Sequence, residues 1–186
     1  MESLADQILR LNLSITNHPR GTDKNGPHSY IKHVYQPLIE IAQSPTALLE
    51  IGSFGGASLV LWKSAFPQCE IIGFELDSVA ELHPVASELV EGEGITLYYL
   101  DAYFAGFNLV KNQLFDLIID DGSHQLSHQQ AAVEQLWPLL RPGGVFVVED
   151  IQSQEDASAF AREGGWTFED WRDRGRYDDL IAWRTK

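Results

Sequence analysis

Residues 115–124 read FDLIIDDGSH, a short apolar run that ends on two adjacent carboxylates and a glycine. The run at 117–119 shows no alternation of polar and apolar side chains, which is typical of a strand buried on both faces of a sheet. Asp120 and Asp121 at its end would cost stability unless a positive charge lies close to them. The stretch therefore predicts a central strand of a helix-covered sheet, with a charged site at its carboxyl end.

Strands and helices are predicted to alternate on both sides of this stretch. The core strands are expected at 47–52, 69–77, 95–102, 115–122 and 145–151. The helices are expected at 55–66, 84–90, 127–140 and 155–163. This alternation predicts an α/β, Rossmann-like doubly wound fold with a mostly parallel seven-stranded sheet. Two closing strands at 166–172 and 178–185, joined by a turn through Gly175, would give it an antiparallel last strand.

The first 46 residues are expected to form a helical cap on this core, and residues 1–186 to form a single domain. Apolar residues recur at helical spacing from Leu4 to Ile15, which predicts a first helix. A second helix is predicted over 29–43, with a kink at Pro37. Between them, residues 17–28 are rich in turn formers and are expected to form a loop.

The composition limits the classes of function. The 186 residues carry a formal net charge of −14, and 44% of them are hydrophobic, as in a globular domain. Such an acidic chain lacks the basic face that nucleic acids or anionic membranes attract. Cys69 is the only cysteine, which excludes an intrachain disulfide and a Cys-based zinc site. With no secretory signal pattern and no apolar run of spanning length, we expect a cytoplasmic protein without nucleic-acid or membrane partners.

The turn after the first predicted strand contains candidate cofactor residues within the sequence LEIGSFGGAS. They are Glu50, Gly52, Ser53, Gly55 and Gly56. Glycines at this turn let the chain bend sharply and let a ligand approach the backbone. A purely structural strand-to-helix turn uses glycine in the same way, so the turn alone is weak evidence.

Other strand ends carry acids that suit an adenosine. Glu75, about twenty residues further on, can accept both hydroxyls of a ribose. Asp101, followed by Ala102, is placed to reach an adenine amino group. Asp120 points to the other side of its strand from Asp121 and is expected to face the cofactor. Because several strand ends agree, the sequence predicts an adenosine-shaped slot.

S-adenosylmethionine (SAM) suits this slot better than other adenosine cofactors. The turn does not spell the G-x-G-x-x-G of a dinucleotide site. None of the six tyrosines has a lysine four residues later, as a short-chain dehydrogenase requires. A phosphate-binding P-loop is also absent, because Lys63 does not follow a glycine. The charged amino-acid end of SAM would lie at the glycine turn near Glu50.

A second group of acids lies at the ends of two strands that are expected to be neighbours. Asp121 ends one strand, and Glu149 and Asp150 end the next, so the three carboxylates would converge at one point. An all-oxygen set suits Mg²⁺, with Mn²⁺ or Ca²⁺ as alternatives. The competing interpretation is that these acids are solvated and cap helices.

The order of these motifs resembles the class I SAM-dependent methyltransferases over roughly the last three quarters of the chain. A narrower resemblance is to the metal-dependent O-methyltransferases of macrolide deoxysugars, the mycinamicin and macrocin type. It is carried by GTDK and the following His and Tyr residues at 21–35, by IDDGSH, by LRPGG and by VVEDIQ. The resemblance implies Mg²⁺ at Asp121, Glu149 and Asp150, with sites left open for two substrate hydroxyls. The chain is much shorter than members of that family.

His124 lies three residues after Asp121 and is the candidate general base, because the pKa of a histidine suits proton transfer near neutral pH. His128 is expected to be only a helix residue. The GTDK loop, with Lys24, is either an active-site lid, as the resemblance suggests, or a surface loop. Tyr30 and Tyr35 are expected to be packing residues. The tryptophans of the closing strands are expected to be core or interface residues and are given no role; they are Trp166, Trp171 and Trp183.

The sequence therefore predicts a SAM- and Mg²⁺-dependent O-methyltransferase that acts on a small polyhydroxylated acceptor. A deoxysugar of a natural product is preferred to a catechol-like diol. One alternative is a protein of the cephalosporin hydroxylase type, which resembles the same fold and acid cluster. Another is a non-catalytic SAM-binding partner of a different enzyme. The sequence leaves a homo-oligomer open.

Overall fold

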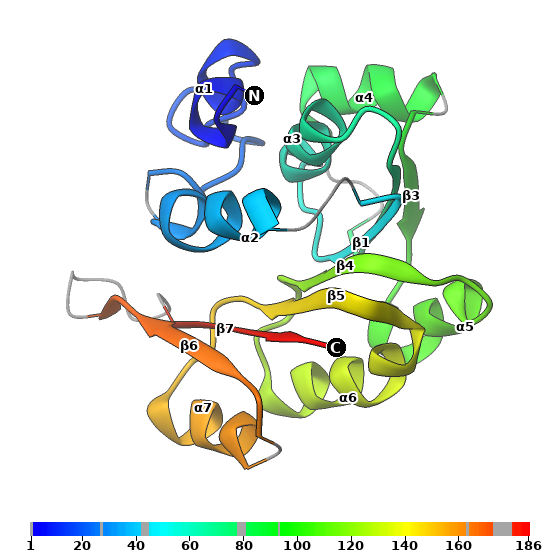
Figure 1. Cartoon of the computed structure of the whole chain (residues 1–186). Coiled ribbons are helices and arrows are strands. Elements are labelled where there is room, and N and C mark those ends of the chain that lie inside the picture. The colour runs from blue at the N-terminus through cyan, green and yellow to red at the C-terminus, as the bar shows by residue number, and fades with distance from the viewer. Residues whose placement is uncertain are drawn as a thin grey trace.

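The computed structural model describes residues 2–26, 28–41, 45–77, 81–92, 94–162, 164–172 and 180–186. Its centre is a seven-stranded sheet with the order β3-β2-β1-β4-β5-β7-β6 (Figure 1). The strands are β1 (Ala47–Ile51), β2 (Glu70–Glu75), β3 (Thr96–Tyr99), β4 (Phe115–Asp120), β5 (Leu140–Val148), β6 (Thr167–Asp170) and β7 (Leu180–Thr185). Neighbours among β1 to β5 pair in parallel, and β7 is antiparallel to both β5 and β6. The predicted fold class and the antiparallel last strand are confirmed.

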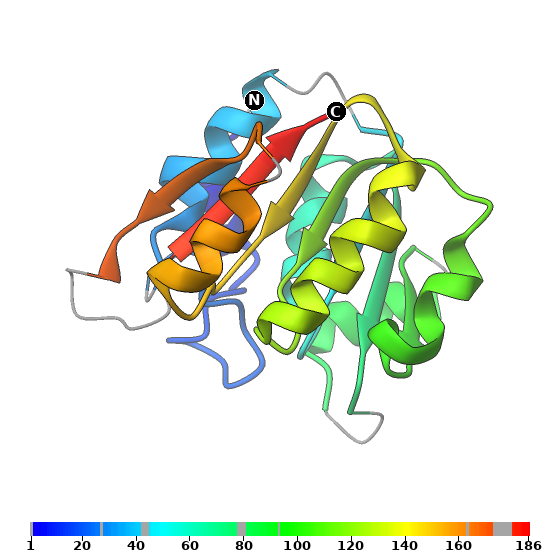
Figure 2. The same ribbon diagram turned by 90° about the horizontal axis from the view of Figure 1, so that it is seen from below.

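Helices cover both faces of the sheet (Figures 1 and 2). One face carries α1 (Leu4–Arg10), the π-helical turn η1 (Ile31–Tyr35), α2 (Gln36–Ile41), α3 (Ala57–Ala65) and α4 (Pro84–Glu91). The other carries the π-helical turn η2 (Ala102–Gly106), α5 (Phe107–Val110), α6 (Leu126–Leu136), the 3₁₀ turn η3 (Trp137–Leu139) and α7 (Gln154–Ala161). Among the described helices, none is long and apolar enough to cross a membrane.

Alternate residues of each strand enter two different cores, as the two-residue period of a strand requires. Leu48 and Ile119 pack with the helices of the first face, whereas Leu49 and Ile118 pack with those of the second. Trp62 of α3 is fully buried in the first core. Burial of a large apolar side chain stabilises the fold by roughly 1.5–3 kcal/mol, so these paired cores fix the central strands firmly.

The structure differs from the sequence predictions mainly at the ends of elements. The first helix ends at Arg10, and Asn12 then adopts a positive φ of 55°. The predicted helix at 29–43 contains a π-helical turn before α2, with Pro37 in the first turn of α2. The predicted strand at 145–151 begins earlier, since β5 already starts at Leu140, the last residue of the predicted helix at 127–140, and its register against β4 shifts there. The predicted turn through Gly175 lies outside the described residues.

The register of the sheet brings the carboxyl ends of its strands to one edge. Ile51 of β1 pairs with both Phe74 of β2 and Asp120 of β4. Asp120 in turn pairs with Val148 of β5. The loops that follow these strands therefore start side by side, as they do at ligand sites of open α/β sheets.

Candidate functional site

A cavity of about 610 Å³ lies at this edge of the sheet. Its walls come from the loops that follow β1, β2, β3 and β4, together with the N-terminal segment 21–24. Of the predicted cofactor residues, six line it: Gly52, Ser53, Gly55, Glu75, Asp101 and Ala102. Apolar side chains form part of the wall; they include Ile51, Phe74, Leu76 and Leu100. The cavity is therefore both polar and apolar, as small-molecule sites commonly are.

Gly52 brings the loop after β1 against the loop after β4. Its φ is +82°, and a Cβ there would lie 1.9 Å from the carbonyl oxygen of Asp121. Its N–H and that of Ser53 both donate to the carbonyl oxygen of Phe74. Because any side chain at this position would push the two loops apart, Gly52 is required for the shape of the cavity. Gly56, which caps the start of α3 with a φ of 76°, is not among the described residues that line the cavity.

Glu75 and Asp101 accept hydrogen bonds from the backbone of the loops around the cavity. Glu75 Oε2 accepts from the N–H of Phe54 at 2.6 Å, which ties the loop after β2 to the glycine turn. Asp101 Oδ1 accepts from the N–H groups of Tyr103 and Phe104 at 3.0 and 3.2 Å and so caps η2. Each carboxylate lines the cavity while holding a loop in place.

Glu50 points away from the cavity. It is fully buried, and its Oε2 accepts from the indole N–H of Trp62 at 2.9 Å. Burial raises the pKa of the Glu50 carboxyl. The residue faces α3 because it lies on the same side of β1 as Leu48, so any effect on a ligand would be indirect.

Asp120 lies behind Tyr103. Its side chain is fully buried, and its Oδ1 accepts from the Tyr103 hydroxyl at 2.6 Å. Burial raises the pKa of Asp120 to about 6. Tyr103 lines the cavity and stacks on His128, with ring centroids 4.6 Å apart. His128 also lines the cavity, although the sequence predicted only a helix residue.

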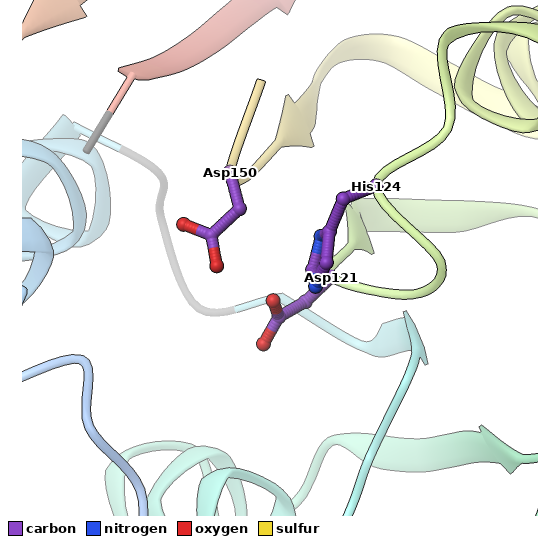
Figure 3. A group of neighbouring side chains, drawn as sticks. All are labelled: Asp121, His124 and Asp150. Atoms are coloured by element: carbon purple, nitrogen blue, oxygen red, sulfur yellow. The ribbon is translucent and has the colours of Figure 1, made fainter. Parts of the chain in front are cut away.

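Asp121, His124 and Asp150 form a group at one end of the cavity, and all three line it. Each offers one oxygen or nitrogen atom, and these atoms lie within 4.8 Å of one another. Figure 3 shows the two carboxylates approaching from the ends of β4 and β5, with the imidazole beside Asp121. His124 and Asp150 have positive φ values of 58° and 53°, an unusual backbone for residues other than glycine. The backbone just after β4 and just after β5 therefore bends so that these three side chains come together.

Lys24 supplies the positive charge that the acids at the strand ends require. Its ammonium lies 2.6 Å from Asp121 Oδ2, 2.7 Å from Glu149 Oε1 and 3.5 Å from Glu50 Oε1. Only 1% of its side chain is exposed. Burial lowers the pKa of Lys24, but the surrounding carboxylates outweigh it and raise that pKa well above its ordinary value, so the side chain stays protonated.

Two tyrosines that were expected to be packing residues contact the acids directly. Both are fully buried in the first core. The Tyr30 hydroxyl donates to Asp150 Oδ1 at 2.6 Å, and the Tyr35 hydroxyl donates to Glu149 Oε1. Glu149 is therefore occupied by Lys24 and Tyr35, and it is not part of the group that Asp121, His124 and Asp150 form among the described residues.

Residues 49–151 match a family model described as a methyltransferase domain. The chain belongs to this methyltransferase family. Its resemblance to the sugar O-methyltransferases is also confirmed. It is 29% identical over 131 residues to the mycinamicin VI 2''-O-methyltransferase of Micromonospora griseorubida, a match that covers 67% of this chain and 32% of the relative. It is 34% identical over 131 residues to a tetracenomycin-C rhamnosyl 3'-O-methyltransferase of Streptomyces olivaceus, covering 64% and 32%.

The methyltransferase chain thus spans about a third of the length of the curated relatives it matches. Solved structures share its fold. A methyltransferase from the mycinamycin biosynthetic pathway in complex with Mg, SAH and mycinamycin VI superimposes with a TM-score of 0.71 at 21% identity, covering all of this chain and 53% of that one. An O-methyltransferase from Bacillus cereus in complex with SAH gives a TM-score of 0.64 at 17% identity, covering 100% and 92%.

Proposed function

We propose that this chain binds SAM and transfers its methyl group to a hydroxyl of a small polyhydroxylated acceptor, with a deoxysugar of a natural product as the preferred class. The observation that carries the proposal is the arrangement of one cavity. Gly52, Glu75 and Asp101 line one part of it, and the group of Asp121, His124 and Asp150 lines another. The curated relatives are named as O-methyltransferases of sugar-bearing compounds, which supports the acceptor class.

The residues present fit the cofactor. The cavity of about 610 Å³ is within the usual range for small-molecule sites. Gly52 admits no side chain because the loop after β4 packs directly against it, and this close approach shapes the wall of the cavity. We expect Glu75 to accept hydrogen bonds from the ribose hydroxyls and Asp101 to accept one from the adenine amino group. The apolar wall that includes Phe74 and Leu100 suits an adenine ring.

The acids fit a divalent cation, preferably Mg²⁺ and alternatively Mn²⁺. Asp121 and Asp150 are carboxylates from neighbouring strand ends, and oxygen ligands are those that Mg²⁺ prefers. We propose Asp121, Glu149 and Asp150, the three carboxylates predicted from the sequence, as its ligands. In the structure Glu149 also accepts hydrogen bonds from Lys24 and Tyr35. A bound divalent cation would lower the pKa of an acceptor hydroxyl, as it does for water.

His124 is proposed as the general base. Its ring lies beside Asp121 and Asp150, and its Nδ1 is buried without a hydrogen-bond partner. Because His124 also lines the cavity, its imidazole is placed to take a proton from a substrate hydroxyl that lies beside Asp121 and Asp150. His124 would accept the proton that the hydroxyl loses, while SAM, when bound, would supply the methyl group through cleavage of its S–CH₃ bond and leave as S-adenosylhomocysteine.

The first test is a calorimetric titration of the purified, metal-stripped chain with SAM, with and without Mg²⁺. Micromolar binding is the expected result. A panel of deoxysugar glycosides and catechols is then incubated with SAM and Mg²⁺, and methylated products are detected by mass spectrometry. Binding of SAM without transfer to any acceptor would favour the non-catalytic alternative. The absence of SAM binding under both conditions would contradict the proposal.

A further inference from the structure

The segment after β3 contacts the end of β4, although the two strands are not neighbours in the sheet. In the strand order β2 and β1 lie between them, which places the two strand ends about 14 Å apart. Tyr103 of η2 makes the contact, because its hydroxyl donates to Asp120 Oδ1 at 2.6 Å. Its backbone N–H donates to Asp101 Oδ1 at 3.0 Å. One residue therefore joins the segment that we propose to bind the adenosine to the loop that follows β4.

The oxygen of Tyr103 also accepts a hydrogen bond from the loop after β4. The N–H of Ser123 donates to it at 3.3 Å, and the N–H of Gly122 donates to Asp120 Oδ1 at 3.3 Å. These two N–H groups come directly before His124, whose φ of 58° is unusual for a residue other than glycine. Because an unusual backbone conformation persists only where its surroundings hold it, these hydrogen bonds help to hold the loop.

The loop after β4 packs closely around the Tyr103 hydroxyl. A Cβ at Gly122 would lie 2.2 Å from its oxygen, so only glycine admits the hydroxyl there. The Tyr103 ring stacks on His128, and His128 Nδ1 lies 2.8 Å from the Ser123 hydroxyl. Burial and the Asp120 carboxylate raise the pKa of Tyr103, so the phenol stays protonated and remains a donor. The hydroxyl is therefore held in one position, with a donor and an acceptor on opposite sides of the contact.

We propose that Tyr103 is a positioning residue for methyl transfer, whose hydroxyl fixes the loop that presents Asp121 and His124 to the acceptor. This inference rests on the proposed function, because the position of the loop affects turnover only if the loop carries the base. The Tyr103 ring lines the cavity, whereas its hydroxyl contacts Asp120 and Ser123. Removing the oxygen and keeping the ring therefore releases the loop without opening the cavity wall.

The test compares Tyr103→Phe with the matched control Tyr98→Phe. Tyr98 is a partly buried tyrosine of β3 that packs on Phe74, and it is not among the described residues that line the cavity. Tyr103→Phe is expected to lower kcat by about tenfold or more, because a small displacement of the base slows the reaction. Its SAM affinity, measured by calorimetry, is expected to stay within about threefold of the wild type. Tyr98→Phe is expected to match the wild type in both measurements.

A second readout is independent of activity. Backbone ¹⁵N relaxation of the full chain gives the order parameters of the Ser123 and His124 amides. They are expected to fall from about 0.85 in the wild type to below about 0.6 in Tyr103→Phe, because the loop loses an acceptor. If the unpaired Asp120 carboxylate prevents Tyr103→Phe from folding, Tyr103→Phe/Asp120→Asn removes that buried charge and keeps an oxygen for the N–H of Gly122. The same losses are expected in this double variant.

The outcomes separate this inference from the proposed function. A wild-type kcat in Tyr103→Phe would overturn the inference. A lower kcat with unchanged order parameters would also overturn it, because the hydroxyl would then act on the reaction directly. Loss of SAM affinity together with kcat would make the hydroxyl a cofactor ligand and not a positioning group. Absence of methyl transfer by the wild type would overturn the proposed function and this inference together, whereas the other outcomes leave the proposed function standing.

Discussion

The Tyr30 hydroxyl donates a 2.6 Å hydrogen bond to Asp150 Oδ1, which joins the residue before η1 to the residues after β5. The bond fixes the orientation of one carboxylate that we propose as a metal ligand. Partners of this kind commonly change metal affinity by 10- to 100-fold. The consequence can be measured, because the hydroxyl can be removed without changing the ring.

Tyr30→Phe is expected to weaken Mn²⁺ binding by about tenfold, because Asp150 loses the donor that orients it. Isothermal titration of metal-stripped protein measures the change. Tyr98→Phe is the control, since it removes a hydroxyl from a partly buried tyrosine of β3 that packs on Phe74. Equal affinity of Tyr30→Phe and the wild type would show that the hydrogen bond does not support the metal site.

Gly52→Ala is expected to abolish measurable SAM binding, because its Cβ would meet the carbonyl oxygen of Asp121 at 1.9 Å. Gly143→Ala is a matched control with the same φ of +82°, and a Cβ there has no neighbour within 4 Å. Both variants should lose about 1 kcal/mol of stability from the positive φ. Calorimetric titration with SAM distinguishes the two variants, because only Gly143→Ala is expected to bind it. Similar SAM affinities in the two variants would mean that the close approach of the loops is unimportant for binding.

His124→Ala is expected to lower kcat by about 10²- to 10⁴-fold while leaving SAM affinity unchanged, because a general base acts only on the reacting proton. His33→Ala, at an exposed position of η1, serves as the control. Mn²⁺ affinity is measured in parallel. If His124→Ala loses Mn²⁺ affinity together with turnover, the imidazole is a metal ligand and the base must be sought elsewhere.

Asp116 at the start of β4 gives a prediction on acid stability. Its Oδ2 accepts from the N–H and hydroxyl of Thr46, from the N–H of Ala47 and from Arg141. Burial raises the pKa of Asp116, but these hydrogen bonds outweigh it and the net pKa is lowered. The folded state thus binds the proton less readily than the unfolded state, so the stabilisation is present above about pH 4 and is lost as the pH falls below it.

Urea unfolding of the wild type and Asp116→Asn between pH 7 and pH 3 measures this effect. The wild type should be the more stable at pH 7, and its advantage should shrink below about pH 4. An advantage that grows as the pH falls would contradict the assigned direction of the shift.

Cys69 is expected to be unreactive in the folded chain. It is 1% exposed, and burial raises the pKa of its thiol to about 12. Because the thiolate is the reactive form, Ellman's reagent at pH 8 should label the protein only after urea is added. Rapid labelling of the native protein would show that the segment just before β2 opens readily.

The edge of the sheet on which the site lies could be predicted from the sequence, because parallel strands place their carboxyl ends at the same edge. Glu75, Asp101 and Asp121 follow that rule, and each lines the cavity. Glu50 is a strand residue, and strand alternation alone assigns it to the face of Leu48, where α3 covers it. This alternation is therefore sufficient to predict the burial of Glu50, although its place beside the glycine turn suggested that it binds the cofactor.

Other parts of the site could not be predicted from local patterns. Lys24 and Asp121 are separated by 97 residues, and no periodicity relates a turn-rich loop to a strand end. The contact of Tyr30 with Asp150 spans 120 residues in the same way. The π-helical turn η2 has no propensity signal of its own, although Asp101 caps it locally through the N–H groups of Tyr103 and Phe104.

The N-terminal segment supplies the cation and the two phenol groups that contact the acids, although the family match begins only at residue 49. A fragment trimmed to the matched residues would keep every predicted carboxylate and lose Lys24, Tyr30 and Tyr35. Chimeras that exchange cores between relatives at this boundary would therefore separate the acids from their partners. The unit to be transplanted or shortened in protein engineering begins before Lys24.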